Sequence, residues 1–281
     1  MRSTDAAGGE LIAPGLVPIT SLGGGELFEV WSAFDERLYA PVVVKVLRPE
    51  RDDAAGRAAV EHEADLLSRL HHPGLVRLFS ADVDAHRPHL VLENIDGPTL
   101  SSLVSRFGPL EPHQLLPLGL ELASALHYLH GEGVVHLDVK ASNVVMGAPA
   151  RLIDLSIAMD VKRAAELDHA IGSDEYMAPE QCEPGARGSV GPASDVWALG
   201  VTLFRAAAGF RPFDREPLWA QLHDEPHPLP ERVPAPMAEI IGDCLAVDPE
   251  RRPLPVEVAE RLEPMLGALP AARLAGFSLR R

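Results

Sequence analysis

The stretch VVHLDVKASNVV, residues 134–145, places three polar side chains between two runs of valine. Asp138, Lys140 and Asn143 follow one another there at spacings of two and three residues. The valines predict a buried strand that ends in a short loop, and this loop carries all three polar groups. A lone Asp or Asn in a turn is usually structural. A carboxylate, an ammonium group and an amide on one loop are poorly explained in that way and indicate a chemical site.

The composition supports a chemical reason for these residues. Arginine supplies 22 of the 25 basic residues, and lysine occurs only at positions 45, 140 and 162. Asparagine occurs only at positions 94 and 143. A chain so poor in lysine and asparagine is expected to keep them where their chemistry is required, and two of these five positions lie in residues 134–145.

Length and charge exclude several classes of protein. With 281 residues, 46% of them hydrophobic, the chain can form one large domain or two packed lobes. A formal net charge of −16 disfavours nonspecific binding to nucleic acid or to an anionic membrane. A basic protein or peptide partner fits this charge, although an ordinary solvated acidic surface is the simpler explanation. No apolar run approaches the ~20 residues of a membrane span, and there are only two cysteines, so we expect a cytoplasmic protein.

The order of elements predicts strands first and helices afterwards. Residues 19–47 have strand character around a glycine-rich turn, and residues 54–70 have helical periodicity. A hairpin is expected over residues 74–94, followed by long apolar helices at residues 111–133 and 196–209. This change of pattern argues for two lobes. A flexible leader, a strand-rich lobe, a joint, a helical lobe and a tail are expected at residues 1–18, 19–93, 94–98, 99–266 and 267–281, respectively.

A single lysine stands in the predicted strand APVVVKVL, residues 40–47. A buried, unpaired ammonium group is costly, so Lys45 requires an anionic partner. The predicted helix that follows offers Glu61 and Glu63, and the phosphate oxygens of a ligand could supply another. The glycines at positions 23–25 suit a loop whose N–H groups bind phosphate, although a plain hairpin turn is the simpler explanation of these glycines alone.

A further aspartate, Asp154, lies at the end of an apolar stretch, RLIDLS at residues 151–156. The side-chain oxygens of Asn143 and Asp154 suit Mg²⁺, which takes few protein ligands and completes its shell with phosphate and water. Asp138 is then free to accept a proton or to orient a hydroxyl group.

In combination these motifs resemble those of the eukaryotic-type Ser/Thr protein kinases, in particular the bacterial (Hanks-type) branch. The resemblance covers roughly residues 19–266. It is carried by the strand lysine in VVVK, the catalytic loop HLDVKASN, the triplet DLS, the activation-segment end GSDEYMAPE, the helix SDVWALG and the turn DPERRP. It implies an α+β bilobal fold, with a small β-rich N-terminal lobe containing one helix and a larger, mainly helical C-terminal lobe.

The resemblance implies catalytic roles for the charged residues. Lys45 would hold the α- and β-phosphates of ATP and be fixed by Glu63, with Glu61 as the less favoured partner. Asp138 would orient the substrate hydroxyl for in-line attack on the γ-phosphorus. Lys140 would neutralise charge on the phosphoryl group in transfer.

The resemblance also implies ATP and Mg²⁺ as cofactors, with Mn²⁺ as an alternative metal. Asn143 and Asp154 would be the metal ligands. Adenine would stack between the lobes, although plain core packing also explains the apolar residues concerned. The expected nucleotide-binding residues besides Lys45 are Leu22, Gly23, Gly25, Val30, Val43, Leu92, Glu93, Ile95 and Val145.

Other matched residues have supporting roles in this resemblance, namely His136, Leu155, Ser173, Glu180, Asp195 and Arg252. Asp195 would brace the backbone of the catalytic loop, and Glu180 would pair with Arg252. Lys140, together with the GS before YMAPE, indicates serine or threonine rather than tyrosine as the acceptor, and Ser173 would then form hydrogen bonds near Asp138 and Lys140 rather than be a phosphorylation site.

Three positions depart from the family pattern. Phe28 replaces the third glycine of the loop, and we expect it to alter phosphate cover or nucleotide affinity. Leu137 replaces an arginine that normally needs a phosphate on the activation segment, and residues 154–180 contain no threonine. We therefore expect activity without phosphorylation of this segment. Ser156 replaces the glycine of D-F-G and restricts the backbone there.

Two other classes of function share parts of this pattern. A pseudokinase would keep the fold and act as a scaffold, but it usually lacks one of the lysine or aspartate positions that are all present here. A small-molecule phosphotransferase of the aminoglycoside-kinase type lacks the YMAPE and SDVWALG elements. The preferred partner is therefore a protein substrate, with a separately encoded regulatory protein as a further expectation.

Overall fold

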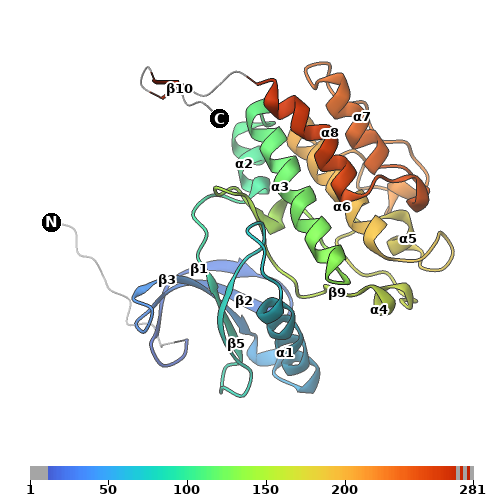
Figure 1. Ribbon diagram of the computed structural model, residues 1–281. Coiled ribbons are helices and arrows are strands. Elements are labelled where there is room, and N and C mark those ends of the chain that lie inside the picture. Colours follow the sequence, from blue (N-terminus) through green and yellow to red (C-terminus); the bar gives the residue numbers. More distant parts are fainter. Residues whose placement is uncertain (1–11, 270–272, 275–276, 279–281) are drawn as a thin grey trace. The chain divides into compact units, whose positions relative to one another are not determined.

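The computed structural model describes residues 12–269, 273–274 and 277–278, and the chain divides into two units (Figure 1). The first unit contains the chain up to His71 together with Val76–Asp96 and Asp154–Ser156. The second contains His72–Leu75, Gly97–Ile153 and the chain from Ile157 onward. The chain passes from the first unit to the second after Asp96, within the predicted joint at residues 94–98.

An antiparallel sheet of five strands forms most of the first unit, in the order β1-β2-β3-β5-β4. The strands are β1 (Leu16–Gly24), β2 (Phe28–Asp35), β3 (Ala40–Leu47), β4 (Leu78–Asp82) and β5 (His89–Glu93). A short 3₁₀ turn, Pro49–Arg51, leads to helix α1 (Ala54–Arg69), which contacts β3, β4 and β5. The Asp53 side chain caps α1 by accepting a hydrogen bond from the Gly56 N–H.

One face of this sheet carries a hydrophobic core. Along β3, Val42, Val44 and Val46 are fully buried in this core. Because side chains alternate along a strand, Val43 and Lys45 point to the opposite face. The run of valines therefore holds one lysine at a fixed position on the side of the sheet away from this core.

The N-terminal boundary differs from the expected one. β1 begins at Leu16, and Ile12 and Leu16 are buried in the core of the sheet, although residues 1–18 were expected to form a flexible leader. The reason is that these apolar side chains cover the core face of β2 and β3. Residues 1–11 of the expected leader lie outside the described residues.

The second unit is mainly helical. Its longer helices are α2 (Leu100–Phe107), α3 (Pro112–Gly131), α6 (Pro192–Ala208), α7 (Ala235–Cys244) and α8 (Pro255–Gly267). Its shorter helical segments are Ala141–Asn143, α4 (Val161–Ala165), α5 (Pro179–Cys182), Ala220–Leu222 and Pro249–Arg251. α3 packs against both α6 and α8 (Figure 1). α6 is apolar around most of its circumference and almost wholly buried, which is typical of a central core helix.

Short strand pairs hold the loop at residues 136–143. β6 (Val134–Val135) pairs antiparallel with β9 (Met159–Asp160), and β7 (Val144–Val145) pairs with β8 (Arg151–Leu152). The predicted strand before the polar loop is thus confirmed. Near the C-terminus, β10 (Arg273–Leu274) pairs with β11 (Phe277–Ser278), and the rest of the expected tail beyond residue 269 lies outside the described residues. Within the described part of the chain, we find no helix with the length and apolar character that crossing a membrane requires.

Candidate active site

Lys45 is the centre of a buried ion cluster in the first unit. Its Nζ atom lies 2.9 and 2.7 Å from the two carboxylate oxygens of Glu63 and 2.7 Å from Oδ1 of Asp154. Lys45 is 6% exposed and Glu63 is 1% exposed. The alternative partner, Glu61, lies on the exposed side of α1. Glu63 is therefore the partner of Lys45 on α1, and it is the residue that the sequence analysis favoured over Glu61.

The surroundings of Lys45 keep it charged. Burial opposes the ammonium charge, but the carboxylates of Glu63 and Asp154 outweigh that effect and raise the pKa of Lys45 above its usual value. Burial raises the pKa of Glu63, an effect that the Lys45 charge opposes. Lys45 is therefore a fixed positive charge at the centre of this cluster.

The DLS triplet is anchored to this cluster. The Leu155 N–H donates to Oε1 of Glu63 over 3.2 Å, and the Leu155 side chain is fully buried. Asp154 has a φ of 69°, a left-handed conformation that costs energy in a residue with a Cβ and often occurs at functional sites. Ser156 is not in that conformation, so serine replaces the family glycine without requiring a left-handed backbone.

Glycines shape the turn between β1 and β2. Gly23 and Gly24 have φ values of 99° and 143°, and a Cβ on Gly24 would lie 2.2 Å from the Phe28 carbonyl oxygen. Gly25 donates its N–H to the same carbonyl over 3.1 Å. Gly25 has open space around it, and Leu22 beside the turn is 55% exposed. The turn therefore needs glycine at two positions and leaves its neighbours accessible.

The strand register gathers the predicted nucleotide-binding residues of the sheet on one face. Val30 lies opposite Lys45, and Val43 lies opposite Leu92. These residues share the face away from the valine core. Glu93 and Ile95 lie at the end of the same unit, whereas Val145 belongs to β7 of the second unit. Contact of these residues with a nucleotide remains a prediction.

The catalytic-loop residues form a second network, within the second unit. Nζ of Lys140 lies 2.7 Å from Oδ2 of Asp138 and 2.7 Å from Oγ of Ser173. Ser173 donates its hydroxyl hydrogen to Oδ1 of Asp138 over 2.7 Å. Asn143 donates from Nδ2 to both the backbone oxygen and Oδ2 of Asp138, over 3.0 Å each. The expected hydrogen bonds of Ser173 are therefore present, and the Asp138 carboxylate is held by three side chains.

Asp195, at the start of α6, fixes the backbone of this loop. It accepts hydrogen bonds from the N–H groups of His136 and Leu137, over 2.8 Å each, and lies 2.9 Å from Nε2 of His130. Burial alone would raise the pKa of Asp195, but the bond to His130 and the backbone N–H of His136 hold it below its usual value. Leu137 has a φ of 65°. Asp195 thus stabilises a loop conformation that is itself strained.

Glu180 and Arg252 form the expected buried pair. The guanidinium of Arg252 donates to both carboxylate oxygens, over 2.6 and 2.9 Å, and both side chains are fully buried. Ser194 donates its hydroxyl to Glu180 over 2.7 Å. A bidentate pair with this extra donor satisfies the charges that burial removes from water.

Gln181 is a supporting residue that the sequence did not reveal. Its Nε2 donates to the carbonyl oxygens of Leu137 and Ile171, over 3.1 and 3.0 Å. One buried amide therefore links the catalytic loop to the segment that follows Asp154 in the sequence. The sequence signal that could have revealed this role was the polar side chain of Gln181 within MAPEQC, a run that is buried in the structure.

Asn143 of the second unit and Asp154 of the first unit each carry an oxygen of the kind that binds Mg²⁺, and their joint ligation of one ion stays a prediction. Nδ2 of Asn143 donates toward Asp138, and its side-chain oxygen is the atom that can ligate a cation. Asp154 supplies a carboxylate beside Lys45. An amide oxygen and a carboxylate are of the ligand types that Mg²⁺ takes beside phosphates.

With this geometry established, comparison with known proteins identifies the family. A family model described as the protein kinase domain matches residues 16–261. The chain belongs to the protein kinase family. The kinase domain therefore occupies most of the chain, and its first matched residue coincides with the start of β1.

Several bacterial proteins are similar to this kinase domain. Serine/threonine-protein kinase PknB of Mycobacterium leprae is 32% identical over 249 residues, which cover 82% of this chain and 39% of that protein. Probable serine/threonine-protein kinase PkwA of Thermomonospora curvata is 33% identical, over 87% of this chain and 33% of that protein. PknA of Mycobacterium tuberculosis is 32% identical, over 81% and 56%, respectively. The chain thus spans about one third to just over half of these relatives.

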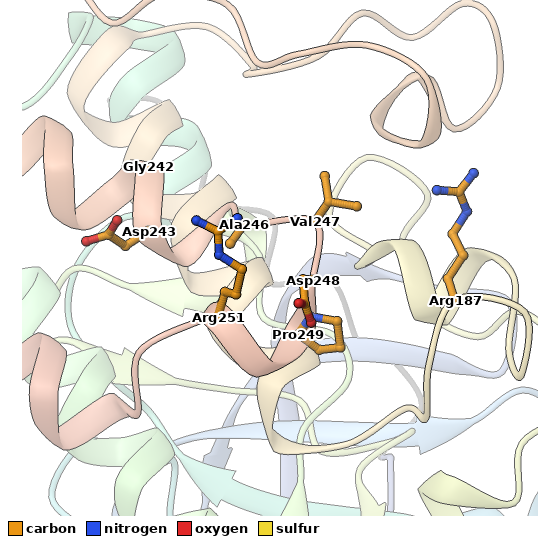
Figure 2. Close-up of a pocket in the computed structure, with 8 residues that line it drawn as sticks. All are labelled: Arg187, Gly242, Asp243, Ala246, Val247, Asp248, Pro249 and Arg251. Atoms are coloured by element: carbon orange, nitrogen blue, oxygen red, sulfur yellow. The ribbon is translucent and has the colours of Figure 1, made fainter.

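An open hollow of roughly 670 Å³ in the second unit of the kinase domain involves none of the predicted site residues. It is lined by the end of α7, the turn at residues 246–251 and Arg187, and Arg187 and Arg251 stand on opposite sides of Val247 (Figure 2). Arg187 is paired with Glu183, and Asp243 in the lining is paired with Arg261. Since acidic and basic groups balance there, we assign it no ligand.

Proposed function

We propose that this kinase domain transfers the γ-phosphate of ATP to serine or threonine hydroxyl groups of protein substrates in a Mg²⁺-dependent reaction. The observation that carries the proposal is the hydrogen-bonded network of Asp138, Lys140, Asn143 and Ser173. This network orients one carboxylate as an acceptor and keeps an ammonium group beside it. Such an arrangement supports the positioning and charge stabilisation on which phosphoryl transfer depends.

Each residue has a specific task in this proposal. Lys45, fixed by Glu63, binds phosphate oxygens of ATP with its charge. Asn143 and Asp154 would hold Mg²⁺, which would supply positive charge beside the phosphates. Asp138 accepts a hydrogen bond from the attacking hydroxyl, a contact of the same kind as the one Ser173 makes with it over 2.7 Å.

The acceptor class follows from two further considerations. Lys140 and Ser173 together form the arrangement that the kinase resemblance associates with serine and threonine acceptors. The relatives quoted above are also named serine/threonine-protein kinases.

The net charge of −16 favours basic proteins among the substrates. A cytoplasmic location and a separate regulatory protein remain part of the proposal.

We also propose that activity does not require phosphorylation of the activation segment. Leu137 occupies the position of a family arginine that normally needs a phosphate on the activation segment. The Leu137 side chain is instead buried in an apolar cluster. The cluster contains Val135, Leu137, Met159, Ala164 and Val190, with Ile157, Val161, Leu167 and Ile171 packed against it. Apolar packing and the two hydrogen bonds of Gln181 therefore support the segment without an added charge.

A phosphate-transfer assay tests the proposed function. Purified wild-type protein is incubated with labelled ATP, Mg²⁺ and a generic basic protein, and the labelled amino acids are identified after hydrolysis. We expect phosphoserine or phosphothreonine, and a loss of about 10²–10⁴-fold in the Asp138→Asn variant because the hydroxyl loses its acceptor. Asp84→Asn, in the exposed turn between β4 and β5, is the matched control and should keep full activity. Binding of ATP without transfer by the wild type would instead support a scaffold.

A further inference from the structure

An aromatic ring covers the Lys45 ammonium group. The centroid of the Phe28 ring lies 4.4 Å from Nζ of Lys45, and Phe28 is only 4% exposed. This distance is within the range of cation–π attraction, which strengthens when the pair is removed from water. The catalytic roles described above do not include Phe28, so its contact with Lys45 requires a separate explanation.

The strand register explains why the ring lies there. Phe28 begins β2 and pairs with Leu47, while Val30 pairs with Lys45. Phe28 is therefore on the same face as Lys45 and diagonal to it, a separation that aromatic side chains can bridge. The hydrogen bond from the Gly25 N–H to the Phe28 carbonyl oxygen fixes the backbone at this point.

The donors of Lys45 are already engaged. A lysine ammonium group has three hydrogens. The three short contacts of Nζ go to the two oxygens of Glu63 and to Asp154, and the ring lies over the same nitrogen. A phosphate group that approaches Lys45 must therefore take the side that the ring covers or displace a carboxylate. Displacing the ring costs less, because it breaks no hydrogen bond and separates no pair of opposite charges.

We propose that Phe28 competes with the phosphates of ATP for the Lys45 ammonium group, so that the ring must leave Lys45 when ATP binds. This inference rests on the proposed function, because it assumes that ATP phosphates reach Lys45. It makes Phe28 a residue that sets nucleotide affinity and discriminates between ligands. ATP must displace the ring, whereas adenosine, which has no phosphate, need not.

Calorimetric titration of two ligands tests the inference. The full chain is titrated with ATP in the presence of Mg²⁺ and, separately, with adenosine. Phe28→Leu keeps an apolar side chain of similar burial but removes the aromatic face, and Phe28→Ser removes both. We expect each variant to bind ATP about 2- to 30-fold more tightly than the wild type, the range that corresponds to the strength of cation–π contacts. Adenosine affinity should stay within about twofold, so the ratio of the two affinities changes.

Phe79→Leu provides the matched control. Phe79 lies on β4 of the same sheet, and its ring is 5.7 Å from the guanidinium carbon of Arg77, so this variant also removes a ring beside a cation. It should leave both affinities unchanged. Thermal unfolding of every variant identifies any that fails to fold, and Phe28→Leu remains informative if Phe28→Ser unfolds.

Three results would overturn the inference. The first is an unchanged ratio of ATP to adenosine affinity in Phe28→Leu, and the second is a weaker affinity for ATP in that variant. The third is the failure of folded wild type and folded Phe28→Leu to bind either ligand, which would also reject the proposed function. In the first two cases the protein binds ATP, so they leave the proposed function intact and reject only the role of Phe28.

Discussion

Lys45 keeps its charge on an apolar strand because Glu63 and Asp154 surround it with carboxylates. The same contacts make the three residues depend on one another. A buried charge that loses its partner is costly, whereas the intact pair is nearly neutral in its net contribution to stability. The cluster is therefore better understood as a way of positioning a cation than as a source of stability.

Replacing Lys45 with methionine tests this dependence. Lys45→Met removes the ammonium group and leaves the Glu63 carboxylate buried, so we expect the free energy of unfolding to fall by about 3–5 kcal/mol at neutral pH. Burial already raises the pKa of Glu63, and the variant lacks the opposing charge. The folded variant therefore binds a proton that the unfolded chain releases, and its destabilisation should grow as pH rises above the ordinary pKa of Glu63, 4.5.

Urea unfolding of Lys45→Met and wild type at pH values on both sides of that pKa measures this effect. Lys162→Met, which alters an exposed lysine of α4, is the control and should unfold like the wild type. A Lys45→Met variant that is as stable as the wild type at neutral pH would show that Glu63 does not depend on Lys45.

At the scale of elements, the loop between β6 and β7 is held from three directions. Asp195 of α6 fixes its backbone, Gln181 of α5 binds the Leu137 carbonyl oxygen, and Ser173 binds the Asp138 carboxylate. The left-handed conformation of Leu137 is maintained by these neighbours. The activation segment, residues 154–180, contributes to the same support through its apolar side chains.

This packing leads to a prediction about phosphorylation. Protein from phosphatase-treated cells, verified by mass spectrometry to carry no phosphate, should have a rate of phosphate transfer within about twofold of untreated protein. The Ser156→Ala variant should behave in the same way, because Ser156 is not one of the apolar side chains that form the cluster around Leu137. Complete loss of turnover in either sample, with folding intact, would mean that a phosphate does activate the segment.

At the scale of the whole molecule, the acidic charge should affect how substrates associate. We expect a net charge of −16 to attract basic proteins, and salt to weaken this attraction by screening the charges. Raising the salt concentration from about 0.05 M to about 0.5 M should therefore raise the KM for a basic protein substrate several-fold. The KM for an uncharged serine peptide should change little. An equal response of both substrates would indicate that charge does not guide association.

The sequence predicted much of the fold and the identities of the site residues. The strand lysine, the loop Asp138–Asn143 and the Glu180–Arg252 pair were recognisable because their chemistry interrupts apolar runs or fits a known spacing. The start of β1 was placed too late, because the burial of Ile12 depends on a sheet whose packing is not local in sequence. The sequence indicated an effect of Phe28 on nucleotide affinity but not its contact with Lys45, and it did not indicate the hydrogen bonds of Gln181. These contacts join positions whose distance only the folded backbone determines.

We propose that Lys45 and Asp138 act together in one phosphoryl transfer. A double-mutant cycle of kcat/KM tests it, using wild type, Lys45→Met, Asp138→Asn and the double variant. Each single change should lower kcat/KM by at least about 100-fold, and the double variant should be little worse than the poorer single one, as for groups that act as a unit. Wild-type protein without phosphate transfer, or single variants that retain most of their activity, would show that the two residues do not act together in this reaction.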